Sequence, residues 1–216
     1  CLEEKRFGQS GEQILVEEYL EGREVSVFAF SDGITLSPLV AACDYKRAFD
    51  NNQGPNTGGM GAYSSPEFWD MNLSHEIQSK IMEPITRALA NEGRTYKGIL
   101  YGGLMLTKSG PRVIEFNCRF GDPEAQVVLP RLENDLSDVA QAIVEGELRK
   151  LTITWSNETY VGVVMASGGY PETYQVGQEI TGLTRLGSDT MVFHAGTKLA
   201  GDGRIISDGG RVLTVV

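Results

Sequence analysis

The segment RVIEFNCR at 112–119 places side chains suited to phosphate and metal chemistry at alternate positions. If it forms a strand, the two-residue period puts Glu115, Asn117 and Arg119 on one face. Carboxylate and amide oxygens can hold a hard cation such as Mg²⁺, and a guanidinium can neutralise a phosphoryl oxygen. The alternative is an amphipathic edge strand whose polar face is only solvated. In either case we expect the opposite face to pack on the core through Ile114, Phe116 and Cys118.

A glycine-rich loop, GPNTGGMGAY at 54–63, has four glycines within eight positions. Glycine permits backbone conformations that turn N–H groups toward an anion. Gly54 and Gly59 have the spacing of a P-loop, but Met60 stands where that motif requires lysine, which excludes it. A flexible surface loop is the alternative to an anion-binding segment. Charges of both signs stand just upstream, at Asp44, Lys46 and Arg47.

An acidic stretch, VEEYLEGRE at 16–24, connects two predicted strands. An extended hinge of this kind can offer a backbone carbonyl and an N–H group to the edge of a purine. Glu24 could then accept a hydrogen bond from a ribose hydroxyl. The alternative is a plain acidic connection between strands.

Hydrophobic periodicity indicates the elements that must position these segments. Alternation around the turn at 31–33 predicts a hairpin over 23–40. A helix is expected at 74–92, with Ser74 as its N-cap, a kink at Pro84 and Gly93 just beyond its end. The other expectations are strands at 13–17, 98–107 and 112–118, a long loop at 44–66, and helices from Pro123 and over 135–148.

The sequence changes character near residue 151. Beyond it, short strands are predicted at 160–166, 190–194 and 211–216, separated by glycine-rich turns and without a long helix. We therefore expect two domains, 1–150 and 151–216, in an α+β fold.

Composition excludes several classes of protein. The chain has 216 residues, of which 41% are hydrophobic and 22% charged, so disorder, collagen and coiled coil are excluded. No apolar run is long enough for a membrane helix. A formal charge of -10 disfavours nucleic acid and anionic membranes as partners. The cysteines, Cys1, Cys43 and Cys118, form no CxxC pair, which predicts a reducing, cytoplasmic setting without a disulfide framework or zinc site.

Together these segments resemble the ATP-grasp ligases, and among them the glycinamide ribonucleotide synthetase (phosphoribosylamine–glycine ligase) family. The resemblance spans the whole chain in order. It implies the C-terminal part of an ATP-grasp domain, an antiparallel sheet with helices packed on it, followed by a small, mostly β C-terminal domain. The motifs that carry it are VEEYLEGRE at 16–24, DYKRAFDNNQGPNTGGMGAYS at 44–64, VIEFNCRFGDPE at 113–124, VVMASGGYP at 163–171 and FHAGTKL at 193–199.

The resemblance also implies roles for individual residues. Glu115 and Asn117 match the family's Mg²⁺ (or Mn²⁺) ligands, and Arg119 would stabilise charge on the transferred phosphoryl group. The hinge residues Glu17, Glu18 and Leu20 match the backbone that holds adenine, and Glu24 matches the ribose-binding carboxylate. Catalytic and substrate-binding roles on the other side of the site are implied for Lys46, Arg47, Asn56, Thr57, Gly58, Gly59, Asp122 and Glu124.

The implied reaction joins glycine to 5-phosphoribosylamine with ATP, through glycyl phosphate, and yields glycinamide ribonucleotide, ADP and phosphate. The alternatives are another ATP-grasp carboxylate–amine ligase and a non-catalytic interaction fragment. The strand at 102–106 lacks the acidic metal ligand of many ATP-grasp enzymes, an absence that the resembled family shares. Because the family has an N-terminal domain and a phosphate-gripping lobe ahead of the hinge, we expect this chain to be a C-terminal portion, inactive alone.

Overall fold

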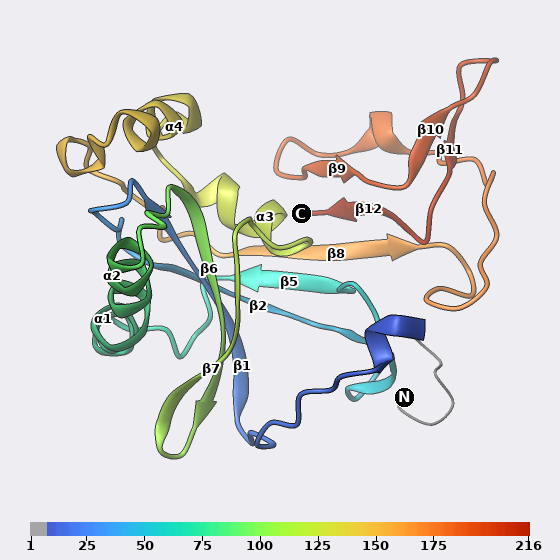
Figure 1. Ribbon diagram of the computed structural model, residues 1–216. Helices are drawn as coiled ribbons and strands as arrows, with labels where there is room; N and C mark the ends of the chain where they lie inside the picture. The colour runs from blue at the N-terminus through green and yellow to red at the C-terminus, as the bar shows by residue number, and fades with distance from the viewer. Residues whose placement is uncertain (1–7) are drawn as a thin grey trace.

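The computed structural model describes residues 8–216 of the chain (Figure 1). Its main feature is an eight-stranded sheet in the order β7-β6-β1-β2-β5-β8-β12-β9, in which every neighbouring pair is antiparallel. The strands of this sheet are β1 (Arg23–Ser31), β2 (Val40–Asp44), β5 (Gly61–Ser64), β6 (Gly98–Thr107), β7 (Gly110–Asn117), β8 (Tyr160–Ala166), β9 (Val192–His194) and β12 (Arg211–Val215). The predicted α+β fold with an antiparallel sheet is confirmed.

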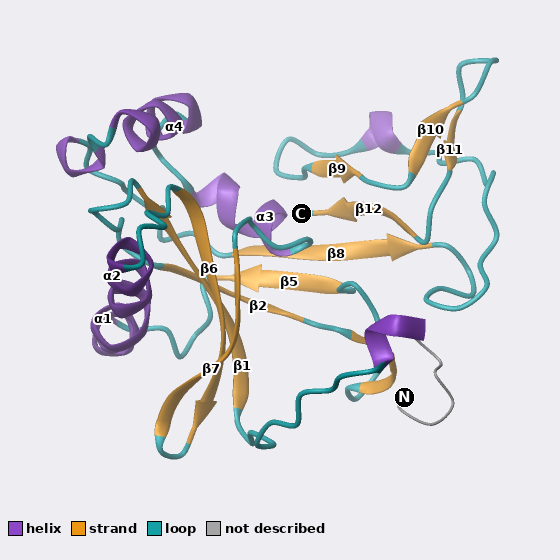
Figure 2. Ribbon diagram, viewed as in Figure 1, coloured by secondary structure: helices purple, strands orange, loops and turns teal. Residues whose placement is uncertain are grey.

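Within the described residues the fold also includes two small hairpins and four α-helices (Figure 2). One hairpin pairs β3 (Arg47–Phe49) with β4 (Gln53–Asn56), and the other pairs β10 (Thr197–Leu199) with β11 (Ile205–Ser207). The helices are α1 (Met71–Ile77), α2 (Glu83–Asn91), α3 (Glu124–Val128) and α4 (Leu136–Glu145). Within residues 8–216, no helix has the length and apolar character needed to cross a membrane.

Strand β1 lies at the centre of the core because helices cover both of its faces. Val25, Val27 and Ala29 pack toward Ile77 and Met82 of the α1–α2 region, as the alternation predicts. The opposite face carries Phe28, which packs with α3, and Phe30, which packs with α4 and Trp155. Covering on both sides explains why seven consecutive residues of this strand are buried.

The first predicted strand, 13–17, is wrong. This segment has no regular secondary structure, and Leu15 and Val16 are 82% and 84% exposed. A strand needs a partner for its backbone groups, and the free edge of β7 is not paired with this segment. The predicted loop at 44–66 is also wrong in part, because it contains β3, β4 and β5.

The predicted helix at 74–92 begins earlier and has a different cap. Asp70, not Ser74, is the N-cap, and its Oδ1 accepts the Leu73 N–H at 2.8 Å. A π-helical turn, Gln78–Met82, precedes Pro84 and joins α1 to α2. Gly93 has a φ of +72° just beyond the helix, as expected for a C′ glycine.

The second half of the chain is continuous with the first at the level of the sheet. Strand β8, which has the predicted bounds 160–166, pairs with β5, and β12 pairs with β8. A short helix at 183–185 is the longest regular helix described beyond residue 151. The division into domains at about residue 151 therefore stays a prediction about folding units, whereas the hydrogen-bonded sheet crosses that point.

Candidate active site

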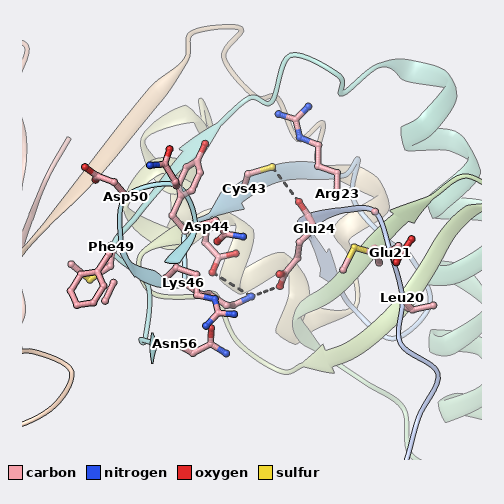
Figure 3. A pocket seen from close by; sticks show the side chains of 18 of the residues that line it. Leu20, Glu21, Arg23, Glu24, Cys43, Asp44, Lys46, Phe49, Asp50 and Asn56 are labelled. Atoms are coloured by element: carbon pink, nitrogen blue, oxygen red, sulfur yellow. Dashed lines mark hydrogen bonds and ion pairs between the residues drawn. The ribbon is translucent and has the colours of Figure 1, made fainter. Parts of the chain in front are cut away.

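A cleft of about 1050 Å³ lies between the hinge ahead of β1 and the segment from β2 to β4 (Figure 3). The hinge contributes Tyr19 to Gly22, including the predicted Leu20, and Met105 of β6 lies beside it. The opposite wall includes Lys46, Arg47 and Asn56. A smaller pocket of about 450 Å³ continues from the hinge toward the turn between β6 and β7, where it is lined by Glu18, Leu20, Lys108 and Arg112.

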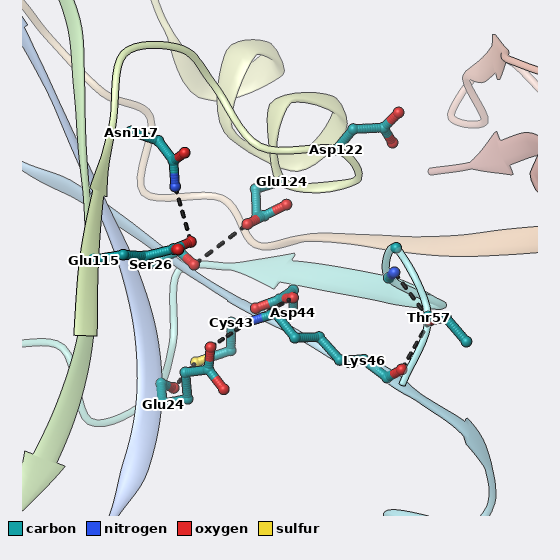
Figure 4. A network of polar contacts seen from close by, with 12 residues as sticks. Glu24, Ser26, Cys43, Asp44, Lys46, Thr57, Glu115, Asn117, Asp122 and Glu124 are labelled. Carbon is teal, nitrogen blue, oxygen red and sulfur yellow. Dashed lines mark hydrogen bonds and ion pairs between the residues drawn. The ribbon is translucent and has the colours of Figure 1, made fainter. Parts of the chain in front are cut away.

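Lys46 connects two acidic side chains at the centre of the cleft. Its ammonium group donates to Glu24 Oε1 and lies 3.4 Å from Asp44 Oδ2. The Asp44 side chain is only 4% exposed, whereas Lys46 and Glu24 are about 40% exposed. Figures 3 and 4 both show these contacts. The predicted ribose-binding Glu24 and the predicted catalytic Lys46 therefore share one ion pair.

The electrostatics of this trio follow from burial. Burial raises the pKa of Asp44, and the charge of Glu24 adds to this, while the Lys46 ammonium opposes it without cancelling it. For Lys46, burial lowers the pKa, but the hydrogen bond to Glu24 and the charge of Asp44 outweigh it, so the pKa is raised. Lys46 thus remains a cation that partly neutralises two carboxylates.

Glu115 and Asn117 project together from β7, as the two-residue period predicts. The Asn117 Nδ2 donates to Glu115 Oε1 at 2.9 Å, which leaves the amide oxygen and the other carboxylate oxygen available (Figure 4). A Cβ atom added to Gly103 of β6 would lie 3.3 Å from the Glu115 Cγ. The glycine on the neighbouring strand therefore gives this carboxylate its space.

Arg119 lies beyond the end of β7, so the strand contributes two members of the predicted row. Its Nη1 donates to the Phe120 carbonyl at 2.9 Å. The expected burial of the opposite face is wrong, because Ile114 is 41% exposed, Phe116 is 36% exposed and Cys118 is exposed. The cause is the edge position of β7 together with a register shift opposite Gly103 and Leu104, which makes the alternation irregular at Ile114.

The donor set suits a hard cation. Among residues 8–216, no cluster of three or more His, Cys, Asp or Glu side chains could hold a metal ion. A divalent ion at Glu115 and Asn117 would therefore have two protein oxygens and would complete its shell with phosphate oxygens and water, which is the usual arrangement for Mg²⁺ with nucleotides.

Asp122 and Glu124, for both of which the resemblance implies substrate binding, face different surroundings. Glu124 is buried, and its Oε1 accepts from Tyr101 at 3.1 Å and from Ser26 at 3.3 Å. Asp122 faces outward, where its Oδ1 lies 3.3 Å from Arg211 Nη1. Burial raises the pKa of Glu124, and the charge of Asp44 raises it further. Sequence reasoning missed Ser26 and Tyr101, because neither belongs to a motif.

The raised pKa of Glu124 gives a testable pH dependence. The folded protein holds this proton more tightly than the unfolded chain, so Glu124 reduces stability as pH rises through its folded-state pKa. Glu124→Gln keeps an oxygen acceptor for Tyr101 and removes the charge. The difference in melting temperature between this variant and wild type should grow in favour of the variant from pH 4 to pH 8. The expected size is roughly 2–4 °C for each 1 kcal/mol of destabilisation that the Glu124 charge causes in wild type. Parallel melting curves across that range would contradict the assignment.

The N–H groups of the glycine-rich loop bond within the protein. Thr57 N–H donates to the Lys46 carbonyl at 2.7 Å and Met60 N–H to the Tyr45 carbonyl at 2.7 Å. Gly58 N–H donates to the Tyr170 hydroxyl at 3.0 Å, and Gly59 N–H to Thr57 Oγ1 at 3.0 Å. The loop therefore does not present these N–H groups to an anion. The loop can contact a ligand in the cleft through side chains such as Asn56, which lines it.

The hinge and the loop reach the cleft in different ways. Glu17 is exposed on the irregular segment ahead of the cleft, and Glu18 contributes to the smaller pocket. Arg47 lines the cleft and its Nη1 donates to the Gly54 carbonyl at 2.6 Å, which ties the start of the loop to β3. The structure thus brings Leu20 of the predicted hinge, Glu24, Lys46 and Arg47 to one cavity. Glu17, Glu115 and Asn117 are not among the residues that line it, and the last two lie on β7, the strand paired with β6.

Solved structures share this arrangement of strands and helices. A phosphoribosylamine–glycine ligase from Thermotoga maritima superposes with a TM-score of 0.79 at 31% identity, over 92% of this chain and 48% of that one. The biotin carboxylase domain of a thermophilic 2-oxoglutarate carboxylase has the same fold at a TM-score of 0.63 and 15% identity, over 92% of this chain and 43% of that one. The fold is that of the ATP-grasp proteins.

The chain belongs to the phosphoribosylglycinamide synthetase family. Residues 1–125 match its ATP-grasp (A) domain and residues 160–216 its C domain. A phosphoribosylamine–glycine ligase of Halalkalibacterium halodurans is 51% identical over 99% of this chain and 49% of its own length. The trifunctional purine biosynthetic protein adenosine-3 of Gallus gallus is 50% identical over 99% of this chain and 21% of its own length. The chain thus spans about half the length of the curated ligases that it matches.

Proposed function

We propose that these residues form part of the active site of a phosphoribosylamine–glycine ligase. In this reaction the glycine carboxylate attacks the γ-phosphorus of ATP and ADP leaves. The amine of 5-phosphoribosylamine then attacks the acyl carbon of glycyl phosphate and releases phosphate. The observation that carries the proposal is the gathering of Leu20, Glu24, Lys46 and Arg47 around one cleft. The cleft reaches β6 through Met105, and Glu115 and Asn117 lie on β7, the strand paired with β6.

Each group has a role that suits its surroundings. The hinge from Glu17 to Leu20 would hold adenine, and Glu24 would accept the ribose hydroxyl. Lys46 and Arg47 would lower the repulsion between anionic reactants, which is the main obstacle to bringing them together. Glu115 and Asn117 would hold Mg²⁺ or Mn²⁺, and the ion when bound would neutralise phosphate charge.

Cys43 and Cys118 are free thiols, which suits the reducing cytoplasm.

Arg119 lies just beyond Asn117 and would reach the transferred phosphoryl group once its side chain turned from the Phe120 carbonyl. Asn56 and Asp122 would contact glycine or phosphoribosylamine through their side chains, whereas Thr57, Gly58, Gly59 and Glu124 would shape the site from behind.

A domain exchange tests this function directly. Residues 1–216 would replace the matching 215-residue stretch of the H. halodurans ligase, which is 51% identical to them. The exchanged protein should release ADP through repeated turnovers only when glycine and 5-phosphoribosylamine are both present. The intact relative is the positive control. A folded exchange protein that consumes ATP with another carboxylate in place of glycine would overturn the substrate assignment.

A further inference from the structure

Arg211 of β12 holds the glycine-rich loop against the turn that precedes α3. Its Nη1 donates to the Asp122 carbonyl at 2.6 Å and to the Gly58 carbonyl at 2.9 Å. The same nitrogen lies 3.3 Å from Asp122 Oδ1 and 3.5 Å from the Gly59 carbonyl. One cationic nitrogen therefore joins three segments that are far apart in sequence, and its side chain is only 22% exposed.

Two glycines of the loop leave room for this contact. A Cβ atom on Gly58 would lie 3.0 Å from the Arg211 Cζ and Nη2 atoms. Gly59 has a φ of +118°, and a Cβ there would lie 2.4 Å from Pro123 Cδ. The missing side chains thus let the loop approach the guanidinium on one side and the Asp122–Pro123 turn on the other.

Tyr170 supplies a second contact from the same half of the chain. Its hydroxyl accepts the Gly58 N–H at 3.0 Å, so both polar groups of Gly58 bond to residues beyond 160. A hydrogen bond from a charged donor is stronger than one between neutral groups, so Arg211 makes the larger contribution. The loop's position is consequently set by the C-terminal strands as well as by β3 and β4.

We propose that Arg211 is a positioning residue that fixes the glycine-rich loop and Asp122 relative to the cleft. The consequence of this positioning for substrate binding rests on the proposed function. The contact between Arg211 and the loop does not depend on that function, and it is tested on the 216-residue chain without any substrate.

Hydrogen exchange of the backbone amides of 57–60 measures how strongly Arg211 restrains the loop. In Arg211→Met, which keeps most of the side-chain volume, these amides should exchange about tenfold faster or more, while the buried amide of Val27 should not change. Arg211→Lys keeps one cationic nitrogen on a shorter side chain and should restore part of the protection. Arg204→Met, which breaks the exposed ion pairs to Asp202 and Glu179, is the matched control and should leave the loop unchanged.

A substitution from the loop side gives an independent check. Gly58→Ala should push the guanidinium away and accelerate the same amides, less than Arg211→Met does. The double variant should be no faster than Arg211→Met alone, because both changes break one contact. Wild-type exchange in Arg211→Met, or equal acceleration at Val27, would overturn the positioning role. Failure of the domain exchange would leave these rates untouched, so the two results are separable.

Discussion

Glu115→Gln should lower the rate of ADP formation in the exchanged ligase by about a hundredfold or more. In wild type the Asn117 Nδ2 lies 2.9 Å from Glu115 Oε1. The substitution keeps the size of the side chain and an oxygen that can accept this hydrogen bond. It removes the negative charge that a divalent cation requires from a site with two protein ligands. A hundredfold loss corresponds to about 2.7 kcal/mol of transition-state stabilisation, a modest share of what a metal ion supplies.

The 216-residue chain offers a second measurement of the same site. Mn²⁺ should broaden the Asn117 side-chain NH₂ resonance of the wild-type chain, and Glu115→Gln should weaken that broadening. Glu172→Gln is the matched control, because Glu172 is exposed in the segment after β8. Full turnover in Glu115→Gln would remove Glu115 from the metal site, whatever the Mn²⁺ titration gave.

The sequence predicts the elements best where a periodic pattern coincides with a covered face. Strands β6, β7 and β8 and helix α4 lie within a few residues of their predicted ranges, because each alternates or repeats between clear turn signals. The alternation of Val25, Val27 and Ala29 also gives the correct core face of β1. Glu115 and Asn117 lie on a common face for the same reason.

The failures have a different physical origin. Ile114 and Phe116 are apolar residues on an edge strand, and periodicity describes which residues share a face without revealing whether anything covers it. Leu15 and Val16 fail as a strand because no partner edge pairs with them. In the glycine-rich loop, composition indicates turns but does not reveal β4, whose existence depends on pairing with β3.

Contacts between distant segments could not be predicted at all. Arg211 lies about 150 positions from Gly58, and a single arginine after two glycines carries no signal for that partner. The pairing of Lys46 with Glu24 is of the same kind, since only the adjacent placement of β1 and β2 brings them together. One sequence without its fold therefore names the residues of a site more readily than it gives their partners.

Lys46→Met should have the second large effect, because Lys46 pairs with Glu24 in the cleft. In the exchanged ligase the variant should lower kcat/KM roughly 10²- to 10³-fold, the cost typical of removing one preorganised donor at a site of developing charge. Three basic and four acidic side chains line the cleft, so the loss of Lys46 leaves it distinctly anionic toward anionic reactants. Lys80→Met is the control of equal charge change, because Lys80 pairs with Glu76 on the helix surface.

The stability of the same variant should acquire a steeper pH dependence. Burial already raises the pKa of Asp44, and Lys46 is the cation that opposes this rise. Without it the pKa of Asp44 rises further, so the folded state binds its proton up to a higher pH and loses stability as pH increases. The melting temperature of Lys46→Met should therefore match wild type most closely near pH 4 and fall below it toward pH 8. A constant difference across that range would mean that solvent, and not Lys46, balances the buried Asp44 charge.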